Sequence, residues 1–270
     1  NSTLVDKYKG KDTFTTFNEG YLFYLQVNFK NNTVANKNVR EALAYAINRK
    51  DLCENVLKDG SMAATGFVPS QLSKSPAGKD FRDDADKYVS YDQKKAQEYL
   101  DAAKKELGTD TITIDLLYGT DESPMDTMAE YLQGSFSKLK GLKVNMVATV
   151  KKDRIYNREA NGNFQVVCTR WGPDYADPTT YLNLALTDNS NNYGKYANAK
   201  FDALMEQIQK ESDLTKRWDL MIQAEKVMME DMAYIPVFEK GSAALKAKNV
   251  KGLVVVPVGT PYTFKYVKLK

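Results

Sequence analysis

The middle of this 270-residue chain alternates apolar, β-branched runs with segments of helical periodicity. Strands are predicted over 111–118, 142–150 and 164–170, and helices over 124–140 and 152–160. Strands that alternate with helices form βαβ units, whose right-handed crossovers place the strands in parallel. The sequence therefore predicts an α/β fold with a largely parallel sheet.

A further strand is predicted over residues 21–29, where apolar side chains occupy every second position. Tyr24 and Gln26 lie on its other, more polar face, which is either solvated or lines a groove. Residues 61–90 show little periodicity and predict a long surface loop, which either serves function or packs as a cover on the fold. The remaining apolar periodicity predicts helices over 36–49, 92–107, 198–211 and 215–231.

A short loop after the strand at 164–170 gathers an aromatic ring, two carboxylates and two prolines in the sequence WGPDYADP, residues 171–178. Asp177 as N-cap and Pro178 as first helical residue predict that a helix begins there. Loops at the carboxyl ends of strands are where open α/β sheets bind ligands. We therefore expect this loop to hold the positively charged end of a ligand, although Asp174 taken alone also fits an Asx-turn.

The composition excludes several classes of function. The chain has no histidine, which removes Ser-His-Asp and Cys-His nucleophiles, histidine bases and HExxH zinc sites, and it has no glycine-rich phosphate loop. We therefore expect no enzyme, no cofactor and no metal site. The net charge of +3 comes from scattered lysines, so no nucleic acid is expected as partner. Cys53 and Cys168 are far apart in the sequence and form no recognisable motif, which leaves the redox compartment open.

The two ends of the chain differ from its middle. The chain starts at Asn1 without an initiator Met or a secretion signal, so we expect a processed product or a piece of a longer protein. No apolar run approaches the roughly 18 residues of a membrane span. After residue 233 the pattern becomes a series of short strands, over 234–238, 252–258 and 263–269. This shift indicates that the tail belongs to a different structural unit.

Three motifs follow one another along the chain. The first is YLQVNF at 24–29, followed by VREALAYAINRK at 39–50; the second is IDLLY at 114–118. The third is WGPDYADP at 171–178, which is preceded by an apolar strand. In this order they resemble the strand, the VRxALxYAIDR helix and the W-x-x-D-Y-x-D-P loop of the solute-binding proteins of peptide ABC importers. This oligopeptide- and dipeptide-binding group is similar to essentially the whole chain.

The resemblance implies a lobe of the type II periplasmic-binding-protein class, in a chain that is the carboxyl-terminal half of a two-lobed protein. Residues 1–20 would be the hinge from the first lobe and 21–236 the second α/β lobe with its βαβ units. Residues 237–270 would be a short, β-rich return segment that belongs to the first lobe. A secretion signal, and the lipid-anchor cysteine of a lipoprotein, would precede Asn1. The protein would be extracytoplasmic, in the periplasm or at the cell surface.

The resemblance also implies roles for individual residues in binding a peptide. In the family, the aspartate of the W-x-x-D-Y motif pairs with the α-ammonium group of the peptide, and here that residue is Asp174. Trp171 would wall the first side-chain pocket, and backbone groups beside it would add the peptide as an extra strand. Tyr175, Tyr24 and Gln26 are further candidates for ligand contact.

The chain departs from the family near the expected site. Some oligopeptide binders carry arginines close to this strand that bind the peptide carboxylate. The aligned positions here are Glu159 and Cys168, with Arg158 and Arg170 one residue away. Arg170 is kept as a candidate, and carboxylate recognition and peptide length stay open. The carboxylates at 121 and 122 are expected to be solvated or to cap a helix.

The resulting expectation is a non-enzymatic solute-binding component of an ABC importer that closes two lobes on a peptide. Its partners would be the peptide, the membrane subunits of the importer and the missing amino-terminal lobe. One alternative is another solute on the same scaffold, such as a nickel chelate, haem or a sugar, although the lack of histidine disfavours direct metal binding. An alternative of another class is an isolated lobe that acts as an interaction or adhesion module.

Overall fold

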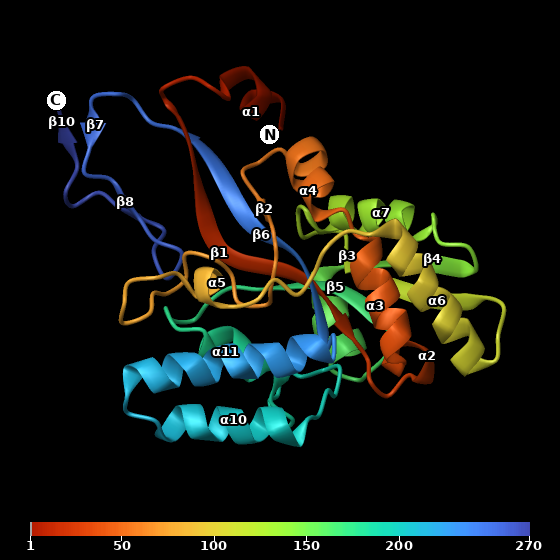
Figure 1. Cartoon of the computed structure of the whole chain (residues 1–270). Helices are drawn as coiled ribbons and strands as arrows, with labels where there is room; N and C mark the ends of the chain where they lie inside the picture. Colours follow the sequence, from red (N-terminus) through yellow and green to blue (C-terminus); the bar gives the residue numbers. More distant parts are fainter. Residues whose placement is uncertain (1) are drawn as a thin grey trace.

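A six-stranded sheet forms the centre of the protein, whose computed structural model describes residues 2–270 (Figure 1). Its strands are β1 (Phe14–Val27), β2 (Met62–Ala63), β3 (Ile112–Gly119), β4 (Leu142–Thr149), β5 (Val166–Trp171) and β6 (Tyr234–Leu245). They lie in the order β2-β6-β1-β5-β3-β4. The parallel pairing expected from the βαβ pattern is present in β5-β3-β4, whereas β2, β6, β1 and β5 pair antiparallel. The sheet is therefore mixed.

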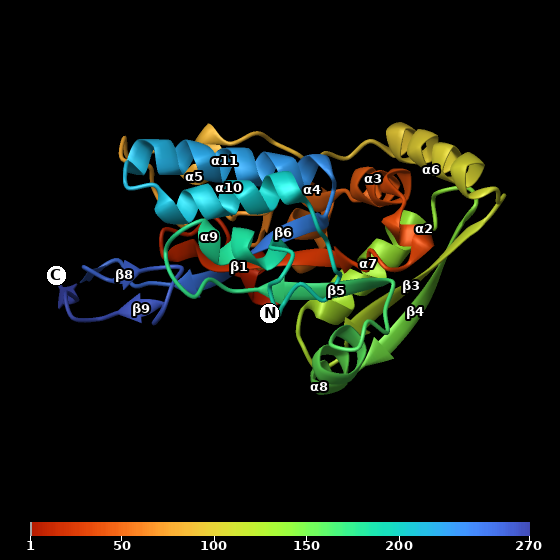
Figure 2. The same ribbon diagram turned by 90° about the horizontal axis from the view of Figure 1, so that it is seen from below.

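Helices cover this sheet, and the longest of them are α3 (Lys37–Ala46), α6 (Gln93–Leu107), α7 (Met125–Phe136), α10 (Ala199–Lys210) and α11 (Leu214–Glu230). The shorter ones are α1 (Ser2–Tyr8), α2 (Asn32–Ala35), α4 (Arg49–Asp51), α5 (Phe81–Asp84), α8 (Lys151–Asp153) and α9 (Thr179–Leu182). Two π-helical turns, η1 (Leu52–Leu57) and η2 (Arg154–Glu159), continue α4 and α8, and a 3-10 turn, η3 (Asn183–Ala185), continues α9. Figures 1 and 2 both show α10 and α11 side by side as one layer.

Local sequence signals set most helix ends as expected. Asn36 accepts a hydrogen bond from the backbone N–H of Val39 and caps α3. Asp92 caps α6 in the same way, and Gly108 ends that helix in the left-handed conformation with φ of 65°. Two helices are shorter than predicted: α3 ends at Ala46, because Ile47 takes an extended conformation, and α7 ends at Phe136, where a turn follows.

The polar face of the strand predicted over 21–29 is not solvated. Tyr24 and Gln26 are only 4% and 3% exposed, because β1 lies between β5 and β6 and side chains cover both of its faces. The Tyr24 ring meets the rings of Phe67 and Tyr234 edge to face, at centroid distances of 5.1 and 5.7 Å. Gln26 donates a hydrogen bond to the backbone carbonyl of Asn191.

The segment 61–90 is a packed cover rather than an exposed loop. Phe67 and Phe81 are fully buried, and the segment contains the short β2 and α5. The buried carboxylate of Glu225, on α11, accepts hydrogen bonds from the backbone N–H groups of Phe67 and Val68 and pairs with Arg82. The structure therefore supports the interpretation that this segment packs as a cover on the fold.

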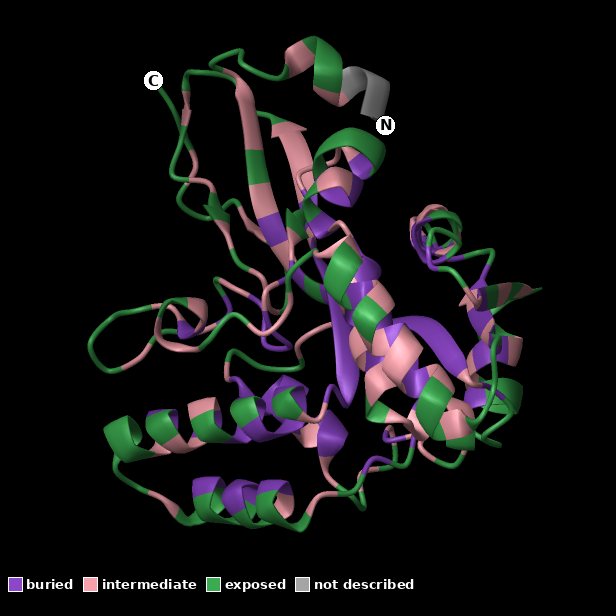
Figure 3. Ribbon diagram, turned by 45° about the vertical axis from the view of Figure 1, so that its right-hand side comes forward, coloured by how far each residue is buried: buried purple, intermediate pink, exposed green. Residues whose placement is uncertain are grey.

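Strands β1 and β6 extend past the rest of the sheet as a two-stranded ribbon. Phe14–Asn18 of β1 pairs with Gly241–Leu245 of β6 beyond the last pairing of β5. Figures 1 and 3 show this ribbon leading away from the densely buried body toward α1 and the tail. The strands predicted over 252–258 and 263–269 are reduced to two-residue pairs, β7 (Val250–Lys251) with β10 (Lys268–Leu269) and β8 (Val254–Val255) with β9 (Tyr262–Thr263).

The ribbon contains parts of two predicted segments, the hinge over residues 1–20 and the return segment over 237–270. Residues 2–20 hold a helix and the first part of β1 rather than a plain connection. The body of the sheet continues to Glu239, which pairs with Leu22 and is buried. The ribbon therefore leaves the body near Gly20 and Lys240, and the division of the chain into hinge, second lobe and return segment stays a prediction.

Candidate functional site

The loop of residues 171–178, here called the Trp171 loop, connects the end of β5 to α9. Asp177 accepts hydrogen bonds from the backbone N–H and the hydroxyl of Thr179, and its carboxylate forms a bidentate ion pair with Arg217. Burial raises the pKa of Asp177, but the Arg217 and Thr179 hydrogen bonds outweigh it and lower the pKa overall. The sequence predicted Asp177 as N-cap and Pro178 as the first helical residue, whereas Pro178 is the N-cap and α9 begins at Thr179; the Asp177 carboxylate still accepts the first helical N–H.

Asp174 lies exposed in the centre of the Trp171 loop. Its backbone N–H donates to the hydroxyl of Thr180 at 3.0 Å, which fixes the loop from within. Within residues 2–270, its carboxylate takes part in no hydrogen bond or ion pair. Tyr175 is also exposed, but its hydroxyl accepts a hydrogen bond from Asn183, lies 3.3 Å from the hydroxyl of Thr179 and is directed back toward α9.

The base of the Trp171 loop is held by aromatic packing. The Tyr181 hydroxyl donates to the backbone carbonyl of Gly20 and lies 3.4 Å from that of Trp171, which ties β1 to the end of β5. A side chain at Gly172 would collide with the Tyr21 ring, since a Cβ there would lie 2.3 Å from it. Only glycine therefore allows Tyr21 to lie against the loop.

A cavity of about 290 Å³, here called the Arg170 cavity, opens beside this loop. Strands β1 and β5 form its floor, and α8, η2 and two loops form its walls. Its lining consists of Tyr21, Tyr24, Gln26, Glu122, Lys151, Arg154, Ile155, Glu159, Thr169, Arg170, Trp171, Asn191 and Tyr193. Its volume is close to the lower limit for small-ligand sites, and its lining is more polar than is usual for them.

One guanidinium joins two buried carboxylates at the bottom of the Arg170 cavity. Arg154 donates from Nε and Nη2 to Oε2 of Glu122, at 3.0 and 2.7 Å, and from Nη1 to Glu159 and to the hydroxyl of Thr169. All three charged side chains are at most 3% exposed. Burial raises the pKa of Glu159 to about 7, because the attraction of Arg154 offsets the loss of hydration only in part.

The position of Glu122 differs from the one predicted from the sequence. It was expected to be solvated or to cap a helix, yet it is buried and bound to Arg154. The reason is the turn after β3, which directs this side chain inward. Its neighbour Asp121 does cap a helix, because its carboxylate accepts the backbone N–H of Lys151 at the start of α8.

The structure brings four of the six predicted ligand residues together around the Arg170 cavity. These are Trp171, Arg170, Tyr24 and Gln26. Asp174 and Tyr175 are not part of its lining and lie further along the loop. Sequence reasoning missed Lys151, Arg154 and Glu159 as lining residues, because KKDRIYNRE reads as a solvated helix and nothing in its spacing marks the π-helical turn.

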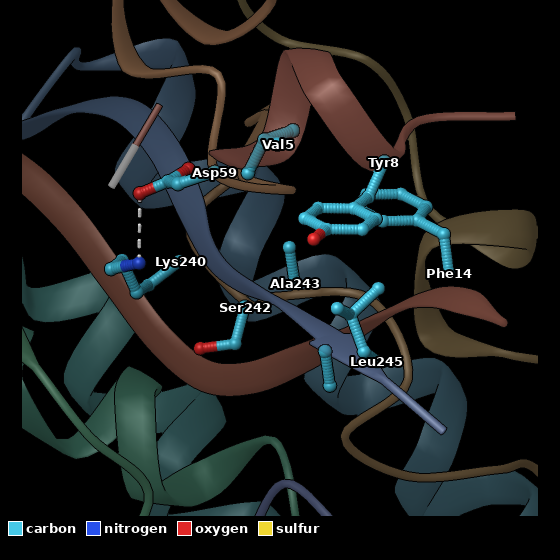
Figure 4. Close-up of a pocket in the computed structure, with 9 residues that line it drawn as sticks. Val5, Tyr8, Phe14, Asp59, Lys240, Ser242, Ala243 and Leu245 are labelled. Atoms are coloured by element: carbon cyan, nitrogen blue, oxygen red, sulfur yellow. Dashed lines mark hydrogen bonds and ion pairs between the residues drawn. The ribbon is translucent and has the colours of Figure 1, made fainter. Parts of the chain in front are cut away.

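A second cavity, of about 360 Å³, lies on the ribbon between α1 and β6 (Figure 4). Tyr8, Phe14 and Leu245 form its apolar side, and Asp59 pairs with Lys240 at 2.9 Å on the other side. None of the predicted ligand residues lines it.

Cys53 and Cys168 are buried and unpaired, and burial raises the pKa of both thiols above the ordinary value.

The family of this chain is decided by its first 193 residues. They match the model of the bacterial extracellular solute-binding proteins, family 5, middle region. The chain belongs to this family. Its members are solute-binding proteins rather than enzymes, which agrees with the non-enzymatic function expected from the residues.

Individual relatives are peptide-binding proteins. A dipeptide-binding protein of Lactococcus lactis subsp. cremoris (strain MG1363) is 31% identical over 280 residues, covering 99% of this chain and 50% of the relative. The substrate-binding domain of an oligopeptide ABC transporter from Bacillus anthracis str. Ames matches with a TM-score of 0.85 at 31% identity, over 98% of this chain and 52% of that one. Listeria monocytogenes OppA bound to peptide gives a TM-score of 0.82 at 32% identity, with 98% and 52% covered.

Two expectations are thereby confirmed. The chain resembles peptide ABC-transporter binding proteins in sequence, and its fold is that of their type II periplasmic-binding class. The chain spans about half the length of the relatives it matches.

Proposed function

We propose that this chain is the carboxyl-terminal lobe of an extracytoplasmic peptide-binding protein, which delivers peptides to the membrane subunits of an ABC importer. The family and its peptide-binding relatives support this proposal. The β1–β6 ribbon has the form of a two-strand hinge, and the first lobe would continue from its far end. In this proposal the peptide is enclosed between the lobes, with the Trp171 loop and the Arg170 cavity on one side of it.

Within this proposal, Asp174 binds the α-ammonium group of the peptide. The observation that carries this assignment is an exposed carboxylate, unpaired within residues 2–270, on a loop in which the Asp177 carboxylate and the Tyr175 hydroxyl are bound internally. An ammonium group enclosed between two lobes requires a charged partner, because an unpaired buried charge costs several kcal/mol. Trp171 would wall the adjoining side-chain pocket, and Tyr24 and Gln26 would line its floor.

The test is calorimetry on the full-length gene product with a mixed peptide library. Asp174→Asn should weaken binding by about 3–5 kcal/mol, which is more than 100-fold, because it leaves the enclosed ammonium group unpaired. Acetylation of the peptide amino groups should weaken binding to the wild-type protein and add little in the variant. Asp188→Asn is the matched control, since Asp188 is exposed and its carboxylate takes part in no hydrogen bond or ion pair within residues 2–270. Equal binding by Asp174→Asn and wild type would reject the assignment, and no binding by the wild type would reject the function.

A further inference from the structure

Two cations with available donors face the Arg170 cavity. The side chains of Lys151 and Arg170 are 48% and 33% exposed. Within the described part of the chain neither side chain makes a hydrogen bond, so their N–H groups are free to meet a ligand. An ammonium and a guanidinium that share a pocket and keep free donors favour a negatively charged partner.

The buried carboxylate of Glu122 holds both cations in position. Oε1 of Glu122 lies 3.6 Å from Nζ of Lys151 and 3.8 Å from Nε of Arg170. That oxygen is buried and has no hydrogen-bond partner among residues 2–270, so it attracts the two cations without being open to a ligand. The guanidinium of Arg170 also lies over the rings of Tyr21 and Phe23, at 5.0 and 5.8 Å from their centroids.

The charged side chains that line the cavity carry a net positive charge. Three cations (Lys151, Arg154 and Arg170) and two carboxylates line it. Arg154 is fully engaged by both carboxylates at the bottom of the cavity. The unmatched positive charge is therefore carried by Lys151 and Arg170, on the side that solvent and ligand reach.

The walls of the cavity suit an aliphatic stem. Tyr21, Trp171 and Tyr193 line it beside the two cations, and its volume of about 290 Å³ exceeds what a bare carboxylate needs. We propose that the Arg170 cavity binds an acidic side chain of the peptide, with its carboxylate on Lys151 and Arg170 and its methylene groups against these rings. This inference rests on the proposed peptide-binding function and names its substrate class. Because Trp171 precedes Asp174 by three residues in one loop, the acidic residue is one of the first in the peptide.

A peptide offers a carboxylate from two sources, a side chain and its carboxyl terminus, and the test separates them. Binding of alanine tetrapeptides to the full-length protein is measured by calorimetry, with Glu or Gln at position 1, 2 or 3. Each peptide is used with a free and with an amidated carboxyl terminus. The Glu peptide should bind about 10-fold more tightly than its Gln counterpart at one position, in both terminal forms, because charge-assisted hydrogen bonds are lost in the Gln peptide.

Matched variants assign the preference to the two cations. Lys151→Gln and Arg170→Gln should each bring the ratio of Glu to Gln affinity close to 1, while Arg170→Lys should keep part of it. Lys152→Gln, at the exposed neighbouring residue, should keep it in full. A urea unfolding curve of each variant verifies its fold.

Four results would overturn the inference. Equal affinity of Glu and Gln peptides for the wild type excludes the subsite, as does a preference that survives both Gln variants. A preference that disappears on amidation assigns the carboxylate to the peptide terminus instead of a side chain. If no peptide binds at all, the proposed function fails as well, and this outcome differs from peptide binding without an acidic preference.

Discussion

Arg154 bridges the carboxylates of Glu122 and Glu159, and all three side chains are buried. A single cation cannot compensate two buried anions, so the weaker-held carboxylate favours its protonated form. Glu122 receives two hydrogen bonds from Arg154 and has two further cations within 4 Å, whereas Glu159 has Arg154 alone. Burial therefore raises the pKa of Glu159, and Arg154 alone offsets this effect only in part.

The proton on Glu159 makes stability depend on pH. Between pH 4.5, its ordinary pKa, and about pH 7, the unfolded chain has lost this proton while the folded chain retains it. Since the folded state binds more protons in that window, the contribution of Glu159 to the free energy of unfolding decreases as the pH rises through it. Glu159→Gln carries no titrating proton and should lose this part of the pH dependence.

Urea unfolding at several pH values between 4.5 and 7.5 measures this effect. The variant should show a flatter profile than the wild type, whatever its absolute stability. Glu130→Gln provides the control, because Glu130 is exposed on α7 and its removal should leave the profile of the wild type unchanged. Parallel profiles for Glu159→Gln and wild type would show that Glu159 has an ordinary pKa.

At the scale of elements, the cover formed by residues 61–90 depends on one carboxylate of α11. Glu225→Ala would leave the guanidinium of Arg82 and the N–H groups of Phe67 and Val68 without their acceptor in a buried place. Breaking a buried ion pair from one side costs about 3–5 kcal/mol. The variant should therefore be less stable by roughly this amount, and the backbone amides of the cover should exchange hydrogen faster.

The measurement combines urea unfolding with hydrogen exchange by mass spectrometry. Lys226→Ala is the matched control at the next position, because the ion pairs of Lys226 are exposed and contribute under about 1 kcal/mol. Glu225→Gln should fall between the two, since it keeps an acceptor but not the charge. If Glu225→Ala exchanged no faster than Lys226→Ala over residues 64–90, the cover would be held by its buried rings instead.

Elements with a strong local signal could be predicted from the sequence, and those fixed by distant contacts could not. Asp92 and Gly108 delimit α6 within a few residues of themselves, and the prediction was correct. The burial of Tyr24 and Gln26 depends on strands β5 and β6, which lie more than 130 residues away, so the sequence could not decide between a solvated face and a groove. In the candidate site, Trp171 and Arg170 were found through a motif. Lys151 reaches the cavity from α8, and Glu159 reaches it from the π-helical turn η2, which leaves no periodic pattern.

At the scale of the whole molecule, apolar side chains are unevenly distributed. The body has one dominant hydrophobic core, whereas the ribbon and tail leave Leu245, Phe264, Tyr266 and Leu269 more than half exposed. Figure 3 shows the same contrast between the buried body and the exposed end of the ribbon. Exposed apolar side chains gathered in one region favour association with another surface.

The 270-residue chain should therefore self-associate when it is purified by itself. Sedimentation velocity at rising concentration should show an increasing weight-average sedimentation coefficient. Replacing Phe264, Tyr266 and Leu269 together by serine should reduce this increase without lowering the urea midpoint, because these side chains add little to the core. Leu214→Ser, at an equally exposed leucine on α11, should sediment as the wild type does. A concentration-independent monomer of the wild type would contradict the expectation, because it would show that the tail is soluble without a partner.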